Sequence, residues 1–186
     1  MTHWHEQPPA HHARPDIAQA VPTLRTDRLA LRAPRLDDFP LLVAIDASVE
    51  DVSLRSHNGR EGTWSDFMQM TATWLLRGHG WWTVDDKNGP AGFVGLGFEP
   101  GDHEPELGYL FSPHARGVGY ATEACTAARN FARDTARLPS LVSYISDANA
   151  ASQNVARKLG AQRDTVAETA LNETGVQIWR HWNTEA

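Results

Sequence analysis

Alternation and helical spacing of apolar residues predict the first elements of the chain. Leu29 and Leu31 alternate with arginines, as in a half-buried strand. Apolar residues three and four positions apart then predict a helix over Leu36–Ser48. A second helix is predicted to begin with an N-cap at Ser65 and to end at Gly78. The residues between the two helices, 49–63, are predicted to form a loop or a broken helix.

Three strand patterns follow in close succession. They cover Trp81–Val84, Gly92–Phe98 and Glu106–Phe111. The first two flank Asn88-Gly89, and this dipeptide is a strong signal for a tight hairpin. We therefore expect an antiparallel meander of three strands. Because successive side chains of a strand point to opposite faces, one of Trp81 and Trp82 is expected in the core and the other at the border of a site.

The rest of the chain alternates helices and strands. The predicted elements are a helix over Tyr120–Arg137, a strand over Leu141–Ser146, a short helix over Asn149–Leu159, and two strands over Ala161–Ala167 and Val176–Trp182. A polar loop, Glu168–Gly175, is expected to join the last two strands. The first of these helices has small residues on one face, which permits close packing on a sheet, and Cys125 there is expected to be a small buried residue.

Composition restricts the class of protein. The chain has 186 residues with 17 basic and 23 acidic side chains, a net charge of −6, and a single cysteine. This length fits one domain with a sizeable core. The negative charge argues against non-specific binding to nucleic acid or anionic lipid, and no apolar run has the length of a membrane span or a signal peptide. We expect a cytoplasmic protein without an internal disulfide.

The first 22 residues differ from the rest. They contain four prolines and four histidines, namely Pro8, Pro9, Pro15, Pro22, His3, His5, His11 and His12. Such a segment buries little surface, so residues 1–22 are expected to form a mobile tail and residues 23–186 the folded domain. The histidines lack fixed spacing on a rigid element, and no physiological metal site is expected from them.

A short glycine-rich segment carries the first functional signal. Arg116-Gly117-Val118-Gly119-Tyr120-Ala121 lies between the third predicted strand of the meander and the following helix. Glycine permits positive φ and close backbone approach, and the first turn of a helix presents unpaired N–H groups. The segment therefore indicates a site for a phosphate-bearing ligand. It lacks the Gly-Lys-Ser/Thr of a P-loop, and the antiparallel strands before it disfavour a Rossmann dehydrogenase.

This segment and three others resemble a known family. Arg116, Gly119 and Ala121 fit the Q/R-x-x-G-x-G/A pyrophosphate loop of the GNAT superfamily of acyl-CoA-dependent N-acetyltransferases. Its continuation through Thr122-Glu123-Ala124, and Asn149–Gly160 with Asn149 and Ser152 three residues apart, are similar to the ribosomal-protein (RimJ/RimL-like) N-terminal acetyltransferases. Leu24–Leu29 and Glu106–Tyr109 agree with the same branch, so the resemblance covers about Thr23 to Trp182.

The resemblance implies an α+β fold of the GNAT type. Its central sheet is mixed, mainly antiparallel, with about seven strands and about four flanking helices. The sheet is splayed between its fourth and fifth strands, here Glu106–Phe111 and Leu141–Ser146. In the family, the pantetheine arm of CoA fills this gap and pairs with the backbone of the first of these strands.

The resemblance also implies acetyl-CoA as cosubstrate, without a metal. Backbone N–H groups around Val118–Thr122 would hold the pyrophosphate, and Arg116 would add positive charge. The implied CoA-binding residues are Leu110, Phe111, Arg116, Gly117, Val118, Gly119, Tyr120, Ala121, Thr122, Asn149 and Ser152.

The implied reaction is the attack of a neutral amine on the acetyl thioester in a ternary complex. Glu106 is the candidate base, acting through a water chain. Glu104 is the fallback, and a reaction without a protein base is a further alternative. The oxygen of the attacked carbonyl would accept a hydrogen bond from a backbone N–H near Tyr109 or Leu110.

The group that would protonate the leaving thiolate differs from the tyrosine that many family members use. Many family members place a tyrosine four residues before the glycine of the short helix, but this chain has Ala156 there. Ser152 is therefore the candidate for a hydrogen bond to the sulfur, and a helix cap is the alternative role for this serine. The implied catalytic residues are thus Glu106, Ser152 and Tyr109.

By resemblance, the acceptor groove lies between Val49–Trp64 and Glu168–Gly175. Acidic residues of these segments that could attract an amine are Glu50, Asp51, Glu61, Glu168 and Glu173. The first hypothesis is acetylation of a protein or peptide N-terminus. The alternatives are acetylation of a small-molecule amine, such as a polyamine, an antibiotic or a metabolite, and acyl-CoA binding without catalysis. We expect no direct nucleic-acid or membrane partner, and a monomer or homodimer.

Overall fold

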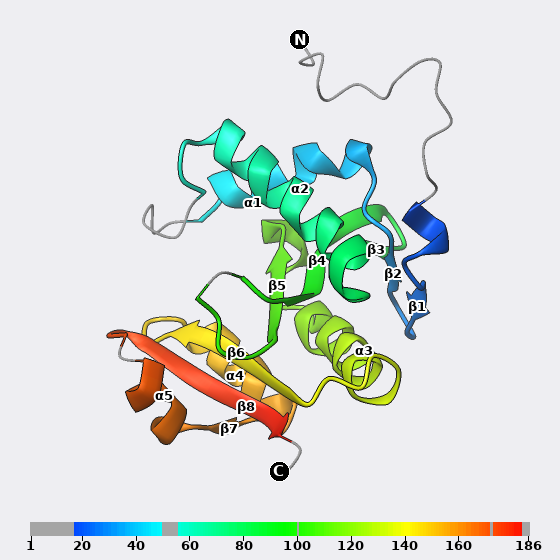
Figure 1. Cartoon of the computed structure of the whole chain (residues 1–186). Helices are drawn as coiled ribbons and strands as arrows, with labels where there is room; N and C mark the ends of the chain where they lie inside the picture. The colour runs from blue at the N-terminus through cyan, green and yellow to red at the C-terminus, as the bar shows by residue number, and fades with distance from the viewer. Residues whose placement is uncertain (1–16, 50–55, 100, 172, 184–186) are drawn as a thin grey trace.

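The computed structural model describes residues 17–49, 56–99, 101–171 and 173–183. Its strands form one sheet in the order β1-β2-β3-β4-β5-β6-β8-β7 (Figure 1). Their bounds are β1 Leu24–Arg25, β2 Ala30–Arg32, β3 Trp81–Asp86, β4 Gly89–Gly97, β5 Glu106–Phe111, β6 Ser140–Ser146, β7 Gln162–Arg163 and β8 Val176–Asn183. All neighbouring strands are antiparallel except β5 and β6, which are parallel.

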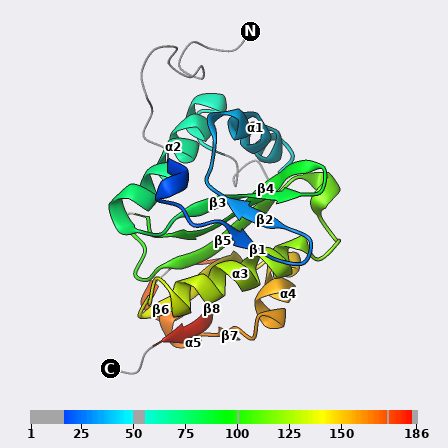
Figure 2. The same ribbon diagram turned by 90° about the vertical axis from the view of Figure 1, so that its right-hand side faces the viewer.

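Helices cover both faces of this sheet. They are α1 Phe39–Ala47, α2 Arg60–Arg77, α3 Tyr120–Asp134, α4 Ala150–Lys158 and α5 Thr165–Leu171. Figure 2 shows α1 and α2 on one side of the central strands and α3 and α4 on the other. The expected α+β fold with a mixed, mainly antiparallel sheet is thus confirmed, with eight strands and five α-helices in the described residues instead of about seven and four.

Two apolar clusters lie on the two faces. The larger joins inward side chains such as Leu31, Trp82 and Leu107 to the small residues of α3. Ala124, Cys125, Ala128 and Ala132 are fully buried, so α3 packs closely on the sheet as predicted. Burial also raises the pKa of the Cys125 thiol, which keeps it protonated and unreactive. The smaller cluster joins Phe93 to α1 and α2.

Several predicted boundaries are wrong for local reasons. The strand expected around Leu29 and Leu31 is β2, and an additional short strand, β1, precedes it across a turn in which Thr26 N–H donates to Leu29 O. Ser65 is no N-cap, because α2 begins at Arg60 and the Ser65 hydroxyl donates to the carbonyl one turn earlier. The helix does end at Gly78, which has the left-handed φ of 72° that a C-terminal glycine supplies.

The segment before β8 was predicted least well. The strand expected over Ala161–Ala167 is only two residues long, and α5 occupies most of the rest and part of the expected loop. Asp164 explains the change, because its carboxylate accepts a hydrogen bond from Ala167 N–H and thereby caps the first turn of a helix.

The folded part of the chain begins earlier than Thr23. Ile17–Gln19 form a short 3₁₀-helix, and Val21 is buried in the larger cluster with 2% of its surface exposed. The Pro22 carbonyl accepts a hydrogen bond from the indole of Trp82. Residues 17–22 therefore belong to the domain, while the histidines at positions 3, 5, 11 and 12 lie outside the described residues.

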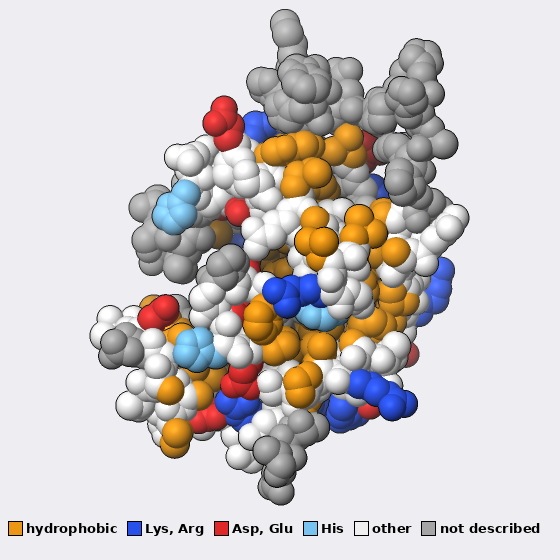
Figure 3. Space-filling model, viewed as in Figure 1, with side chains coloured by type: hydrophobic (Ala, Val, Ile, Leu, Met, Phe, Trp, Pro, Cys, Tyr) orange, Lys and Arg blue, Asp and Glu red, His pale blue; other side chains and the backbone are white. Residues whose placement is uncertain are grey.

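The described helices differ from membrane spans, and the surface carries exposed apolar side chains. None of the helices among the described residues combines the length and the apolar character that crossing a bilayer requires. Hydrophobic side chains gather on the surface over α2 (Figure 3), where Met68, Leu75 and Leu76 are exposed.

Candidate active site

The sheet is splayed between β5 and β6. These two strands pair at a single position, Glu106 with Val142, and Val142 N–H donates to Pro105 O at the same end. One residue further, the Ser143 hydroxyl donates to Leu107 O across 2.7 Å and lies 3.2 Å from His181 Nε2. Beyond this point the strands diverge, as the family resemblance implies.

The side chains of β5 divide between the two faces of the sheet. Leu107, Tyr109 and Phe111 belong to the cluster on the α3 side, whereas Leu110 packs with α1 and α2. Because strand side chains alternate, Glu106 shares the α1 and α2 face with Leu110. The candidate base and the Tyr109 phenol thus lie on opposite faces of one strand.

The backbone of β5 alternates in the same way. Ser112 N–H donates to Ala91 O, and the register pairs Leu110 with Phe93. In an antiparallel ladder, every second residue exchanges hydrogen bonds with its partner, so Leu110 N–H points to β4 and Tyr109 N–H points into the splay. Of the two donors expected for the carbonyl oxygen, Tyr109 has the right orientation and Leu110 does not.

The glycine segment has the conformation of an anion cradle. Gly117 and Gly119 adopt φ of 76° and 90°, which a residue with a side chain rarely adopts. Gly119 is the N-cap residue of α3, no side chain caps this helix, and the first intrahelical bond runs from Glu123 N–H to Gly119 O. The amides of the first turn are therefore oriented toward the loop with the positive end of the helix dipole behind them.

An ion pair braces this loop from a distant part of the sequence. The Arg28 side chain contacts both Glu123 Oε2, at 2.7 Å from Nε, and the Val118 carbonyl, at 3.0 Å from Nη1. Thr26 and the Arg28 backbone donate to the other oxygen of Glu123. The segments Leu24–Leu29 and Thr122–Ala124, noted separately in the sequence, are therefore parts of one contact.

A cavity of about 460 Å³ extends from the glycine segment to α4. All the predicted CoA-binding residues line it except Val118, whose carbonyl binds Arg28 instead. Arg116 lies at the rim, with Nε bound to Phe111 O and Nη2 bound to the Ser48 hydroxyl. Open helix amides, positive-φ glycines and an arginine match the needs of a pyrophosphate, so these residues fit CoA.

Four residues of α4 in this cavity were not predicted from the sequence, namely Ala151, Asn154, Val155 and Lys158. They recur at spacings of three and four, which places them on one helix face. This helical spacing on the element that carries Ser152 was the available signal. Lys158 adds a second cation to the cavity.

Tyr109 and Ser152 meet where this cavity joins a passage of about 280 Å³ through the splay. The Tyr109 hydroxyl donates to Ser152 Oγ across 2.9 Å, and burial raises the pKa of the phenol. Asn149, and not Ser152, is the N-cap of α4, because Asn149 Oδ1 accepts from Ser152 N–H. The Ser152 hydroxyl therefore does not cap the helix. Many relatives have a tyrosine at the position of Ala156, and here Tyr109 of β5 lines the same passage as Ala156.

Burial gives Glu106 the character of a base. It raises the pKa of this carboxyl to about 7, and the neighbouring carboxylates of Asp102 and Glu99 act in the same direction. Glu104, the fallback, differs: Arg180 donates to both of its oxygens, at 2.7 and 2.6 Å, and holds its pKa below the ordinary value. Glu104 is therefore a structural ion-pair partner and a poor proton acceptor.

The α1 and α2 face carries a third cavity, of about 610 Å³, which we call the acceptor cavity. Its walls include Ile45, Met70, Trp81, Phe98 and Leu110. Three carboxylates also line it, those of Asp46, Asp66 and Glu99, and its described lining contains neither lysine nor arginine. The charge of the cavity is therefore negative.

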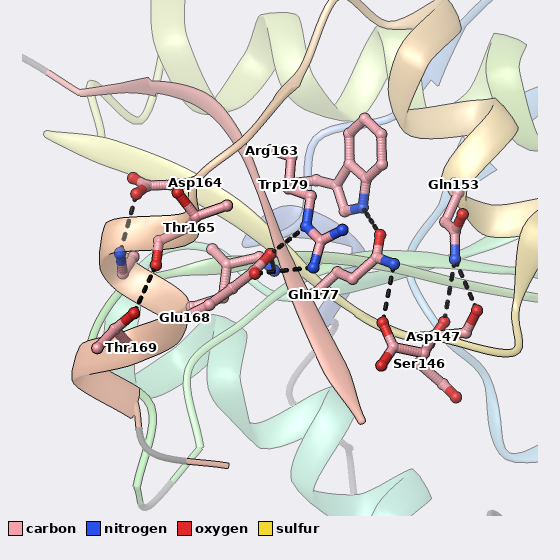
Figure 4. Close-up of polar contacts among 12 residues, drawn as sticks. Ser146, Asp147, Gln153, Arg163, Asp164, Thr165, Glu168, Thr169, Gln177 and Trp179 are labelled. Atoms are coloured by element: carbon pink, nitrogen blue, oxygen red, sulfur yellow. Dashed lines mark hydrogen bonds and ion pairs between the residues drawn. The ribbon is translucent and has the colours of Figure 1, made fainter. Parts of the chain in front are cut away.

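The acidic residues expected in the acceptor groove lie elsewhere or outside the described part of the chain. Glu168 accepts two hydrogen bonds from Arg163 and one from Ile178 N–H, within the polar network that Figure 4 shows around α5 and β8. Glu61 and Glu173 are exposed and do not line the cavity. Glu50 and Asp51 fall outside the described residues.

The comparisons with known proteins agree with this geometry. The family model described as acetyltransferase (GNAT) domain matches residues 28–162. An acetyltransferase from Agrobacterium tumefaciens is 33% identical, with 92% of this chain and 100% of that chain covered and a TM-score of 0.78. No curated protein sequence matches the chain.

Two further solved structures share the fold at low identity. The ribosomal L7/L12 α-N-protein acetyltransferase RimL, in complex with CoA, is 18% identical with a TM-score of 0.62, and 86% of this chain and 96% of that one are covered. The spermidine/spermine N-acetyltransferase SpeG from Vibrio cholerae is 16% identical with a TM-score of 0.61, with 83% and 92% covered. Their scores are nearly equal, so the fold alone does not select the acceptor. The matched family and the Agrobacterium relative show that this chain belongs to the GNAT acetyltransferases and is an acetyl-CoA-dependent N-acyltransferase.

Proposed function

We propose that the chain acetylates the N-terminal amine of a protein or peptide, by direct transfer from acetyl-CoA in a ternary complex. The observation that carries this proposal is the position of Glu106. Its carboxyl is mostly buried, lines the passage through the splay on the β5 face that it shares with Leu110 of the acceptor cavity, and has a pKa of about 7. A base with this pKa is half ionised near neutral pH, which suits general-base catalysis.

The pKa of Glu106 favours an α-amine over an alkyl amine. A peptide α-ammonium has a pKa of about 7.7–8.0, so proton transfer to Glu106 costs about 1 kcal/mol. An alkyl ammonium has a pKa of about 10.4, and the same transfer costs about 5 kcal/mol. The α-amine therefore needs much less help from the rest of the site.

The remaining roles follow from the two faces of β5. Acetyl-CoA, when bound along the glycine segment and the splay, supplies an acetyl thioester. Tyr109 N–H points into the splay and is available to the carbonyl oxygen as negative charge develops there. On the CoA side, Ser152 donates a hydrogen bond toward the sulfur and accepts one from the Tyr109 phenol, 2.9 Å away. A proton that moves along this pair to the thiolate is replaced on the phenol from solvent.

A small polyamine is the second candidate acceptor. The observation in its favour is the set of three carboxylates in the acceptor cavity, Asp46, Asp66 and Glu99, which suits an acceptor with more than one positive charge. Burial and the nearby carboxylates of Asp102 and Asp66 raise the pKa of Glu99, and the described lining of the cavity holds no lysine or arginine that would offset this.

Mass spectrometry tests the proposal. The purified chain is incubated with acetyl-CoA and an equimolar panel of N-terminal peptides, spermidine and lysine. We expect acetyl groups on peptide α-amines and a much lower rate with the alkyl amines. Preferential acetylation of spermidine would select the second candidate. Binding of CoA without any transfer would instead indicate an acyl-CoA-binding module.

A further inference from the structure

Trp81 lies across two strands because two glycines make room for it. The sheet register aligns Trp81 of β3 with Gly95 of β4, and Gly95 with Gly108 of β5. A Cβ at Gly95 would lie 2.3 Å from the indole, and a Cβ at Gly108 would lie 2.8 Å from Cη2 at its tip. Neither glycine can carry a side chain while the ring keeps this position. The indole therefore reaches from β3 to the splayed strand β5.

The tip of this indole lies between two cavities. Trp81 and Leu110 line both the passage of about 280 Å³ through the splay and the acceptor cavity of about 610 Å³. The indole is thus a wall between the space for the thioester and the space for the amine. Trp82, by contrast, is fully buried in the core, as expected for the neighbouring strand position.

The passage is also closed at its inner end. Ser143 crosses from β6 to the carbonyl of Leu107 and lies beside His181, whose pKa burial lowers to about 4. The imidazole is therefore neutral near pH 7 and can donate to the Ser143 hydroxyl, which itself donates to Leu107 O. The small volume beside Trp81 cannot expand in this direction without breaking that chain of hydrogen bonds.

We propose that Trp81 determines acyl-chain length: its indole limits the passage to an acetyl group and excludes longer acyl chains from the thioester site. The inference rests on the proposed function to the extent that the donor is an acyl-CoA. Shortening the side chain would join the passage to the acceptor cavity. A longer acyl chain would then enter the space of the amine and compete with the acceptor.

Calorimetry with an acyl-CoA series tests this without any acceptor. Dissociation constants are measured for acetyl-, butyryl- and hexanoyl-CoA with the wild-type chain, Trp81→Phe and Trp81→Ala. For the wild-type chain we expect hexanoyl-CoA to bind at least tenfold more weakly than acetyl-CoA. In Trp81→Ala the two constants should agree within threefold, and Trp81→Phe should lie between, because phenylalanine is shorter but keeps the aromatic packing.

Trp182→Phe is the matched control. This tryptophan of β8 lines none of the three cavities of the site and should retain the wild-type ratio. Equal binding of hexanoyl- and acetyl-CoA by the wild-type chain, or an unchanged ratio in a folded Trp81→Phe protein, overturns the role of Trp81. Failure to bind any acyl-CoA would overturn the proposed function as well, so the two failures are distinguishable.

Discussion

The CoA side and the acceptor side of β5 are built in different ways. The proposed CoA side is a contiguous segment, Arg116–Ala121, with positive-φ glycines and the first open amides of α3. The acceptor side uses side chains from α1, α2, β3, β5 and the residues that follow β4, which meet only in the folded chain. A site made of backbone groups in one loop imposes a local sequence pattern, whereas a site made of scattered side chains does not.

The two sides also differ in charge. The cavity of about 460 Å³ between the glycine segment and α4, the proposed CoA cavity, is positive because of Arg116, Lys158 and the start of α3. The acceptor cavity is negative because of Asp46, Asp66 and Glu99. One strand separates them. An anionic donor and a cationic acceptor are thereby directed to opposite faces of the same sheet, which suits a ternary complex.

The largest effect is expected from Glu106→Gln, which should affect the acceptor side alone. The amide keeps the shape of the side chain but cannot accept a proton. We expect kcat to fall by about 10² to 10³ at pH 8, within the range for loss of a general base, with the dissociation constant of acetyl-CoA unchanged within twofold. In the wild-type chain, activity should rise with pH through about 7, because the base must be ionised. This limb should disappear in the variant.

The same group predicts a change in stability with pH. A carboxyl whose native pKa is raised from 4.5 to about 7 binds more protons in the native than in the unfolded state over this interval. The free energy of unfolding should therefore fall as pH rises from 4.5 to 7, and it should fall less in Glu106→Gln.

Glu104→Gln is the control for the pH dependence of the rate. It breaks the pair with Arg180 and should leave the midpoint of the pH–rate profile near 7. A midpoint unchanged in Glu106→Gln would remove this residue as the base.

Gly119→Glu tests the CoA side. The substitution forces a side chain onto a φ of 90°, 3.3 Å from Arg28 Nη2, and brings a carboxylate to a phosphate site. We expect the dissociation constant of acetyl-CoA to rise at least tenfold in calorimetry. Gly175→Glu carries the same type of strain at φ 80° in open space, and Gly175 does not line the cavity of the glycine segment. If both variants lose affinity equally, general strain and not the anion cradle is the cause.

Tyr109→Phe tests the proposed proton relay on the CoA side of β5. Loss of the hydroxyl leaves Ser152 without its proton donor, and we expect kcat to fall about tenfold with little change in acetyl-CoA affinity. Ser152→Ala should have a similar effect, and the double variant should be no worse than the worse single one. Rates that fall multiplicatively in the double variant would mean that the two hydroxyls act independently.

The smallest effect is expected from charge in the acceptor cavity. Asp46→Asn combined with Asp66→Asn removes two of its three carboxylates. For a peptide with a basic second residue, steady-state kinetics should show KM about threefold higher and kcat unchanged, because partly exposed charges contribute weakly. Asp134→Asn, on the distant end of α3, should leave KM as it is. An unchanged KM in the double variant would show that these carboxylates do not recognise the acceptor.

Sequence reasoning succeeded where the pattern is local. The strand Glu106–Phe111 was predicted at its observed bounds, and all the residues expected to bind CoA except Val118 line one cavity, while their binding of CoA stays a prediction. Prediction from the sequence failed where a side chain pairs with a residue it was not expected to meet, or where it binds a backbone N–H and so changes the local secondary structure. Asp164 starts α5 within a predicted strand, and Glu168 was expected in the acceptor groove but binds Arg163.

By itself, the sequence determined the family, the donor and the glycine cradle, because positive φ, helix capping and strand alternation are properties of a few neighbouring residues. Only the tertiary structure decided that Tyr109 meets Ser152, that Trp81 lies over Gly108, and that Asp46 and Glu99 share a cavity. These contacts depend on which strands lie side by side and on which faces the helices cover. Neither the strand order nor the helix placement follows from a pattern of neighbouring residues.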